Sequence, residues 1–202
     1  MEYLPLILFV ISTSITPGPN NILILASGVN HGVIKSLPHF FGIGVGFLVM
    51  AIAVGLGAGN LFNQFPILQI GLKTLGVFYL LYLTFMVATA PIKLDAENKK
   101  PFTFMQAVLF QWVNPKAWVM IIGAVVTFST ASNHFLLQVV IIAFVFVSFG
   151  LPCVGLWLLF GVSLKKLLSN PTNLRIFNVT MAILLGTSLV PIACELYTYY
   201  AG

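Results

Sequence analysis

The stretch "SITPGPNNILIL", residues 14–25, places two prolines, a glycine and two asparagines inside a run that is otherwise apolar enough to cross a membrane. Proline has no backbone N–H and its ring clashes with the preceding helical turn, so Pro17 and Pro19 interrupt the helical hydrogen bonds here. Water cannot pair the freed groups in hydrocarbon, where each unpaired group costs several kcal/mol. The stretch therefore predicts a broken membrane helix whose free backbone groups are paired by protein, by water or by a ligand.

The composition of the chain is that of an integral membrane protein. Of its 202 residues, 59% are hydrophobic and 6% are charged, and the mean hydropathy is +1.06. So few polar side chains cannot cover a soluble globule of this size. A membrane span needs about 20 mostly apolar residues, and six windows of the sequence qualify: 3–28, 38–59, 66–90, 103–129, 135–161 and 172–197. We therefore expect an all-α protein with six transmembrane helices that forms one transmembrane domain over residues 1–202.

The basic residues are distributed unevenly between the connections. Six spans put both termini on one side of the membrane, and the connections after the first, third and fifth spans on the other. That second side holds seven of the nine Lys and Arg residues, which are Lys35, Lys93, Lys99, Lys100, Lys165, Lys166 and Arg175. Because basic residues are retained in the cytoplasm, we expect both termini to lie outside the cytoplasm.

A second break matches the first. The stretch "WVNPKAW", residues 112–118, falls near the middle of the fourth window, as Pro17-Gly18-Pro19 falls near the middle of the first. Each broken window begins a half of three spans, about 1–92 and 99–202. An odd number of spans per half threads the second half through the membrane upside down relative to the first. Matching Pro/Gly breaks in such a 3+3 inverted repeat indicate the binding site of a transporter.

Each break also begins a new half-helix. Gly18 and Asn114 can be the N-caps, with a proline at the first helical position of each. The two half-helices then point N–H groups and positive dipole ends toward the membrane centre from opposite sides, where they suit an anion such as an amino-acid carboxylate. The residues predicted to bind substrate are Pro17, Gly18, Pro19, Asn20, Asn21, Asn114, Pro115 and Lys116. The alternative is a pair of proline kinks that only shape the packing, with Asn and Ser side chains pairing the freed groups.

Lys116 is the cation placed at mid-membrane depth, where an ionisable residue indicates function. It follows the second break, at the helix end that disfavours a cation unless an anion joins it. We expect it either to help hold a substrate carboxylate or to change protonation during transport. His31, His39 and His134 fall at or near predicted loops, and we expect them at the membrane interface.

The second window contains two glycine pairs spaced four apart, Gly42 with Gly46 and Gly55 with Gly59. Small residues at this spacing let helices approach closely in membranes. We expect close packing at these positions rather than contact with a ligand.

The spans contain no pair of carboxylates, no cluster of metal ligands and no Ser/His/Asp arrangement. We therefore predict no catalytic residue, no bound metal and no cofactor. No nucleotide-binding motif is present either, so transport would be driven by an ion or substrate gradient, with proton coupling as the working hypothesis. The basic residues form no nucleic-acid patch, and the expected partners are the lipid bilayer and a small substrate, with the oligomeric state left open between a monomer and a homo-oligomer.

Several motifs together resemble those of the LysE/RhtB family of bacterial amino-acid exporters, over nearly the full chain. They are "TPGPNNILILASGVNHG" (16–32), "LKTLGVFYLLYL" (72–83), "NPKA" (114–117), "LWLLFGVSLKKLL" (156–168) and "RIFNVTMAILLG" (175–186). The resemblance implies export of amino acids or close derivatives across the cytoplasmic (inner) membrane of a bacterium, in exchange for protons.

Two positions depart from the family pattern. Members that export basic or other amino acids commonly carry an Asp after the Gly-x-x-x-Gly of the second span, where this chain has Phe47. The departure removes a partner for a cationic side chain and argues against lysine or arginine. Thr84 stands where the family usually has Gly, with no consequence that we can assign. The first motif looks most like the group that exports cysteine and O-acetylserine, so the resemblance implies a small neutral amino acid, of the cysteine, O-acetylserine, homoserine or threonine class.

Two other classes of protein compete with an exporter. Six-span thiol–disulfide electron carriers have a similar topology and pass electrons through cysteines beside the broken helices. This chain has no cysteine near either break, since Cys153 and Cys194 fall in the fifth and sixth windows. A passive channel or scaffold is the other alternative, and it would show no dependence on a gradient.

Overall fold

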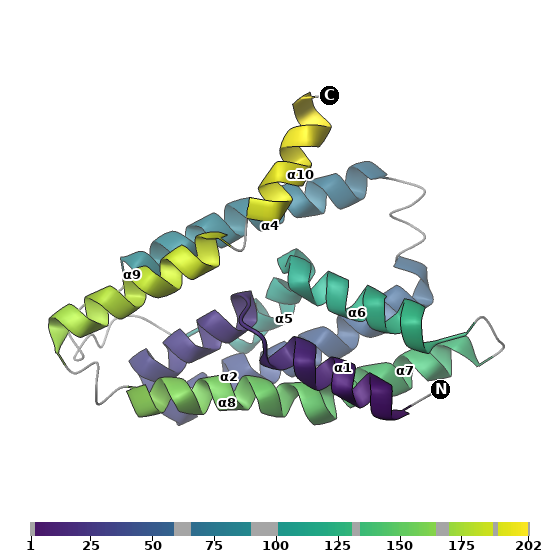
Figure 1. Cartoon of the computed structure of the whole chain (residues 1–202), viewed down its shortest axis with the longest axis horizontal. Coiled ribbons are helices and arrows are strands. Elements are labelled where there is room, and N and C mark those ends of the chain that lie inside the picture. The colour runs from purple at the N-terminus through teal and green to yellow at the C-terminus, as the bar shows by residue number, and fades with distance from the viewer. Residues whose placement is uncertain are drawn as a thin grey trace.

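The computed structural model describes residues 3–58, 66–89, 101–130, 134–164, 170–187 and 190–201, and every regular element within these ranges is a helix (Figure 1). The helices are α1 (Tyr3–Ile15), α2 (Pro19–Ala53), η1 (Val54–Ala58), α4 (Pro66–Ala88), α5 (Phe104–Val113), α6 (Pro115–Phe128), α7 (Phe135–Val145), η2 (Phe146–Gly150), α8 (Leu151–Leu164), α9 (Pro171–Thr187) and α10 (Val190–Ala201). The connection expected between the third and fourth windows lies outside the described residues except for Pro101 and Phe102, and residues 165–169 of the connection after the fifth window lie outside them too.

The first two predicted windows form a broken helix followed by a tight reversal. The first window is divided into α1 and the first half of α2, separated at residues 16–18. Within α2 the chain turns at Gly32, whose φ of 75° lies in the left-handed region that favours glycine. The hydroxyls of Ser27 and Ser36 lie 2.7 Å apart across this turn. The two halves of α2 therefore run antiparallel, joined by a turn rather than by a loop.

The fourth predicted window is also broken, as its Asn-Pro sequence indicates. Helices α5 and α6 meet at Asn114 with a bend of 69°. The fifth window is continuous through α7, η2 and α8, but η2 is a π-helical segment at its middle. π-Helical turns widen a helix locally and occur frequently at functional sites.

Among the described residues, two helices are long and apolar enough to cross a membrane, and a bent pair makes a third. The two are Pro19–Gly57 and Phe135–Leu164, and the bent pair is α5 with α6. The described part of the chain is thus all-helical, with two or three candidate spans by length and composition. The last predicted window is divided between α9 and α10, with residues 188–189 outside the described part.

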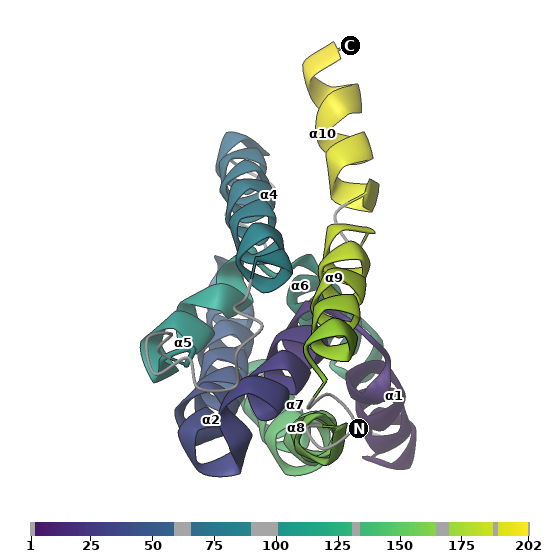
Figure 2. The same ribbon diagram turned by 90° about the vertical axis from the view of Figure 1, so that its left-hand side faces the viewer.

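The helices are arranged in two parts. Helices α1, α2, α7 and α8 lie together with α5 and α6, while α4 and α9 pack on each other alongside them (Figures 1 and 2). The last helix, α10, projects away from the other helices in both views. Both broken helices therefore belong to the larger part.

Glycines bring the helices of this larger part close together. A Cβ added at Gly42 would stand 2.5 Å from Phe104 O, and one added at Gly46 would stand 2.7 Å from Gln111 Cγ. Both of these residues are on α5. The prediction of close packing at this pair is confirmed. Gly55 approaches Val139 in the same way, whereas its predicted partner Gly59 lies outside the described residues.

His39 is buried within the helix packing. Its side chain is 1% exposed, and its ring lies 4.8 Å from that of Phe102. Neither ring nitrogen has a hydrogen-bond partner among the described residues. The tight turn at Gly32 carries this part of α2 into contact with other helices, so protein encloses the side chain, and its depth at the membrane interface stays a prediction.

Candidate binding site at the two helix breaks

The first break leaves the carbonyl groups at the end of α1 without helical partners, and side chains from other helices pair them. The Asn21 amide donates to Ser14 O and to Thr16 O, both at 2.8 Å. The Trp157 indole, on α8, donates to Ile15 O at 3.0 Å. The freed carbonyls are thus paired by protein, which is the outcome that a packing kink alone would also require.

Lys116, which follows the second break, also pairs carbonyl groups of the first break. Its ammonium Nζ lies 2.7 Å from Thr16 O, 2.9 Å from Thr16 Oγ1 and 3.2 Å from Pro17 O. The lysine chain reaches these oxygens by passing over Gly18, where an added Cβ would stand 2.6 Å from Lys116 Cδ and 3.1 Å from Nζ. The two breaks are therefore in direct contact.

The N-terminus of α2 has no such pairing. Gly18 is extended and provides no capping side chain, and Pro19 has no N–H. Ile22 N begins the helical bonding by donating to Gly18 O at 2.9 Å. Among the described residues, no acceptor pairs the backbone N–H groups of Asn20 and Asn21, which form the positive end of the helix.

The N-terminus of α6 is different, because its cap residue, Asn114, pairs the first N–H groups of the helix. Asn114 is extended, and its Oδ1 accepts from Lys116 N at 3.1 Å. Asn114 O then accepts from Ala117 N at 3.1 Å. We expected both half-helices to present unpaired N–H groups, but only α2 does so, since its cap residue is glycine and that of α6 is asparagine.

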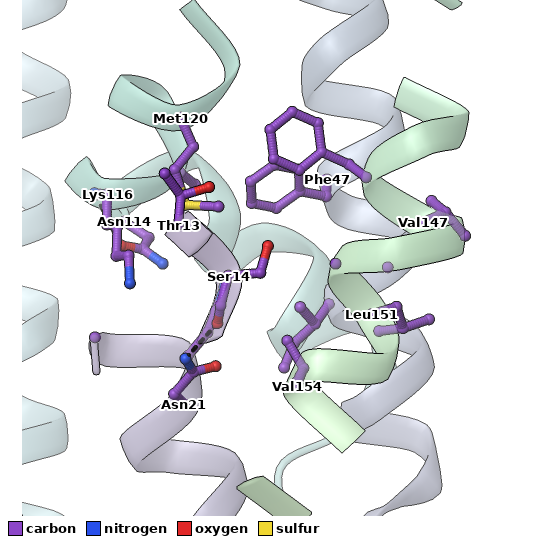
Figure 3. A pocket seen from close by; sticks show the side chains of 17 residues that line it. Thr13, Ser14, Asn21, Phe47, Asn114, Lys116, Met120, Val147, Leu151 and Val154 are labelled. Carbon is purple, nitrogen blue, oxygen red and sulfur yellow. Dashed lines mark hydrogen bonds between the residues drawn. The ribbon is translucent and has the colours of Figure 1, made fainter. Parts of the chain in front are cut away.

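The two breaks border one pocket with about 500 Å³ of empty space, part of which is open to the exterior (Figure 3). One side is polar and comes from the breaks, with Thr13, Ser14, Gly18, Asn20, Asn21, Asn114 and Lys116. The other side is mostly apolar, with Ile43, Gly44, Phe47, Ala117, Met120, Phe146, Val147, Gly150, Leu151 and Val154. Such a lining suits a small molecule with a polar end and an apolar end.

Five of the eight residues predicted to bind substrate line this pocket: Gly18, Asn20, Asn21, Asn114 and Lys116. Pro17, Pro19 and Pro115 are not among the lining residues and instead set the backbone of the breaks. Trp112 and Trp118 bracket the second break and contact each other, the indole of Trp118 donating to Trp112 O at 2.8 Å.

Sequence reasoning missed the apolar side and one polar partner. The rings of Phe47 and Phe146 pack 5.0 Å apart at the pocket, Phe146 coming from the π-helical segment η2. Gln111 is fully buried and exchanges amide hydrogen bonds with Asn20, at 2.8 and 3.2 Å. Phe47 had been singled out by its departure from a family pattern, but nothing in the sequence pairs Gln111 with Asn20.

The pocket lining carries one charged side chain, Lys116, and no acidic one. Within the described residues there is no group of three His, Cys, Asp or Glu side chains close enough to hold a metal ion. A molecule in the pocket would therefore meet amide and hydroxyl groups, one ammonium and two helix ends.

A membrane protein with a pocket between two broken helices has the features of a transporter. The model of the LysE type translocator family matches residues 11–199, so the chain belongs to this family of membrane transporters, which are not enzymes. It is similar to the cysteine/O-acetylserine efflux proteins of Escherichia coli (strain K12), Shigella flexneri serotype 5b (strain 8401) and Shigella sonnei (strain Ss046). Each is 31% identical over 183 residues, which is 88% of this chain and 90% of the relative. No solved structure matches the chain. The family expected from the motifs is confirmed.

Proposed function

We propose that this protein exports small neutral amino acids or their derivatives from the bacterial cytoplasm in exchange for protons. The class is that of cysteine, O-acetylserine, homoserine and threonine. The observation that carries the proposal is the pocket at the two breaks, which offers a polar end for an amino-acid head group and an apolar end for a short side chain. The similarity to cysteine/O-acetylserine efflux proteins supports the same class.

The head group would bind at the first break. Its carboxylate would accept from the N–H groups of Asn20 and Asn21, because an uncapped helix N-terminus suits an anion. The amide of Asn20 is held by Gln111 and that of Asn21 by α1, so both residues are already positioned. Asn114 and Lys116 border the same end of the pocket, and the three prolines set the backbone shape.

The side chain of the substrate would lie against Phe47, Met120 and Phe146. No acidic residue of the pocket lining could pair with the cationic side chain of lysine or arginine. A short uncharged side chain can lie against these apolar residues without leaving a charge unpaired.

We further propose six spans arranged as a 3+3 inverted repeat, with both termini outside the cytoplasm. The two breaks support this, since each lies in the first span of its half and both reach one pocket. Alternating access between two such halves would carry the pocket from one side of the membrane to the other.

Uptake into energised, inverted membrane vesicles tests the proposal. Labelled cysteine, O-acetylserine, homoserine, threonine and lysine are compared, with a protonophore as control. We expect uptake of neutral amino acids, collapse of uptake with the protonophore, and no uptake of lysine. Uptake of lysine alone, or of none of these compounds, would contradict the proposal.

The double variant Cys153→Ser/Cys194→Ser separates export from thiol–disulfide electron transfer. Both cysteines are free, one buried on α8 and one exposed on α10. An exporter keeps its uptake without them, whereas an electron carrier loses its function. Uptake that the protonophore does not reduce would instead indicate a passive channel.

A further inference from the structure

Lys116 occupies the place that an amino-acid ammonium group would need. Its Nζ is held by three uncharged oxygens at the end of α1, namely Thr16 O, Thr16 Oγ1 and Pro17 O. Carbonyl groups at the C-terminal end of a helix are the negative pole of that helix and attract cations. The site therefore already holds a cation, which belongs to the protein itself.

A zwitterion at the first break would require the same oxygens. With its carboxylate on the N–H groups of α2, its ammonium group would fall at the neighbouring end of α1, because the two helix ends are separated only by residues 16–18. Ser14 O and Ile15 O are occupied by side chains other than that of Lys116, and Thr16 O accepts from Asn21 as well as from Lys116. The oxygens of Thr16 and Pro17 are then the acceptors that a substrate could gain by displacing Lys116.

Displaced from these oxygens, a charged Lys116 would be poorly paired. The helices that pack most on α6 are α1, α2, α5, α7 and η1. Their titratable side chains are Tyr3, His31, Lys35 and His39. None of these is acidic and none lines the pocket. An unpaired ammonium inside a membrane protein is costly, whereas a neutral amine is not.

We propose that the ammonium of Lys116 and the ammonium of the substrate compete for Thr16 and Pro17, so that each substrate that binds displaces one proton. This inference rests on the proposed function and gives it a mechanism for exchange. On the cytoplasmic side the substrate takes the oxygens and Lys116 releases one proton to the cytoplasm. On the outer side the substrate leaves, and the Lys116 amine takes one proton from outside and returns to the oxygens.

A different role for Lys116 makes the opposite prediction. If its ammonium held the substrate carboxylate, the charge would be needed in the complex and binding would release no proton. A lysine that served only to clamp α1 would be replaceable by arginine, which also donates to carbonyl groups but stays protonated.

Proton release on binding can be measured with the purified full-length protein in detergent. Cysteine is titrated at about pH 6.5, where its thiol stays protonated, and the released protons are counted in buffers of different ionisation enthalpy. We expect about one proton per cysteine bound. The analogue 3-mercaptopropionate, which lacks the amino group, should bind without releasing a proton.

Variants of Lys116 complete the test. Lys116→Met should bind cysteine with no proton release and no pH dependence, and Lys116→Arg should fold, as judged by its thermal transition, but bind cysteine at least about tenfold more weakly. The matched control Lys35→Met removes an exposed lysine on α2 and should release the same proton as the wild type.

The outcomes separate the inference from the proposed function. Transport of cysteine without proton release, proton release by Lys116→Met, or wild-type binding and transport by Lys116→Arg would each overturn the inference alone. If Lys116→Met does not fold, equal proton release with cysteine and 3-mercaptopropionate overturns it. Failure of the wild type to bind or carry any of the neutral amino acids would overturn the proposed function and the inference with it.

Discussion

Gly18 is the residue at which the two broken helices touch. Its backbone is extended, with φ −176° and ψ 176°, a conformation that any residue can adopt. The requirement for glycine comes instead from Lys116, whose Cδ would stand 2.6 Å from an added Cβ. The sequence identifies Gly18 as a helix breaker, but only the structure shows that its missing side chain makes room for a lysine from another helix.

Gly18→Ala should displace Lys116 from the oxygens of Thr16 and Pro17, whose hydrogen bonds to a charged group contribute about 1.5–3 kcal/mol. Lys116 then no longer changes places with the substrate, so we expect proton-driven export in vesicles to fall about tenfold or more. Gly71→Ala on α4 is the matched control, because an added Cβ there meets nothing within 4 Å. Wild-type export by Gly18→Ala would mean that the contact with Lys116 has no functional role.

Phe47 is expected to limit the size of the substrate. It is 9% exposed, packs on Phe146 and forms part of the apolar wall. Phe47→Ala should enlarge that end of the pocket and raise uptake of methionine and leucine severalfold relative to cysteine. The ratio of initial uptake rates in vesicles measures the change. An unaltered ratio would place the side chain of the substrate elsewhere.

At the scale of elements, the sequence predicts where helices break better than it predicts how they meet. Proline and glycine residues predict the breaks at residues 16–19 and 114–115 from local chemistry alone. The turn at Gly32 falls in the connection expected between the first two windows, residues 29–37, but the sequence does not show that a single glycine makes it so tight. The π-helical segment η2 and the pairing of Asn20 with Gln111 depend on contacts between distant residues, so local patterns carry no signal for them.

The crossing of α2 and α8 depends on two glycines. Gly28 would place a Cβ 2.5 Å from Leu158 O, and a Cβ on Gly161 would collide with Leu25 O. Gly161→Leu should force these helices apart and lower the midpoint of thermal unfolding by several degrees. Gly155→Ala on the same helix is the control, since its Cβ would meet the Phe40 ring at 3.4 Å. Equal midpoints for the two variants would show that the close crossing is not needed for stability.

At the scale of the whole molecule, composition identifies a membrane protein, and the matched family confirms it. The two or three candidate spans that length and composition identify among the described residues are fewer than the six windows of the sequence. Part of the difference arises because Pro19–Gly57 is counted once although it turns back at Gly32. Breaks also shorten other helices: α1 is 13 residues long, α9 17 and α10 12. A hydropathy window identifies a span even when the helix is broken within it, whereas a criterion of minimum helix length rejects the separate pieces.

The six-span topology predicts which connections face the cytoplasm. Alkaline phosphatase, which is active only outside the cytoplasm, can be fused at residues 91–100 or 131–133 of otherwise intact chains. The basic residues around the first of these connections lead us to expect low activity there and high activity at the second. The reverse pattern would invert the orientation, and equal activity at both sites would contradict the single span, 103–129, predicted between them.

The central claim is that a small neutral amino acid binds at the first helix break, and bound Se-methyl-L-selenocysteine, whose side chain is uncharged, tests it most directly. Under reducing conditions, anomalous scattering from crystals of the complex locates the selenium atom without reference to the protein model. We predict one selenium peak between Phe47 and Met120, with the carboxylate at the N–H groups of Asn20 and Asn21 and Lys116 moved away from Thr16. A peak outside the pocket, or a bound ligand with Lys116 still on Thr16 and Pro17, would contradict the account.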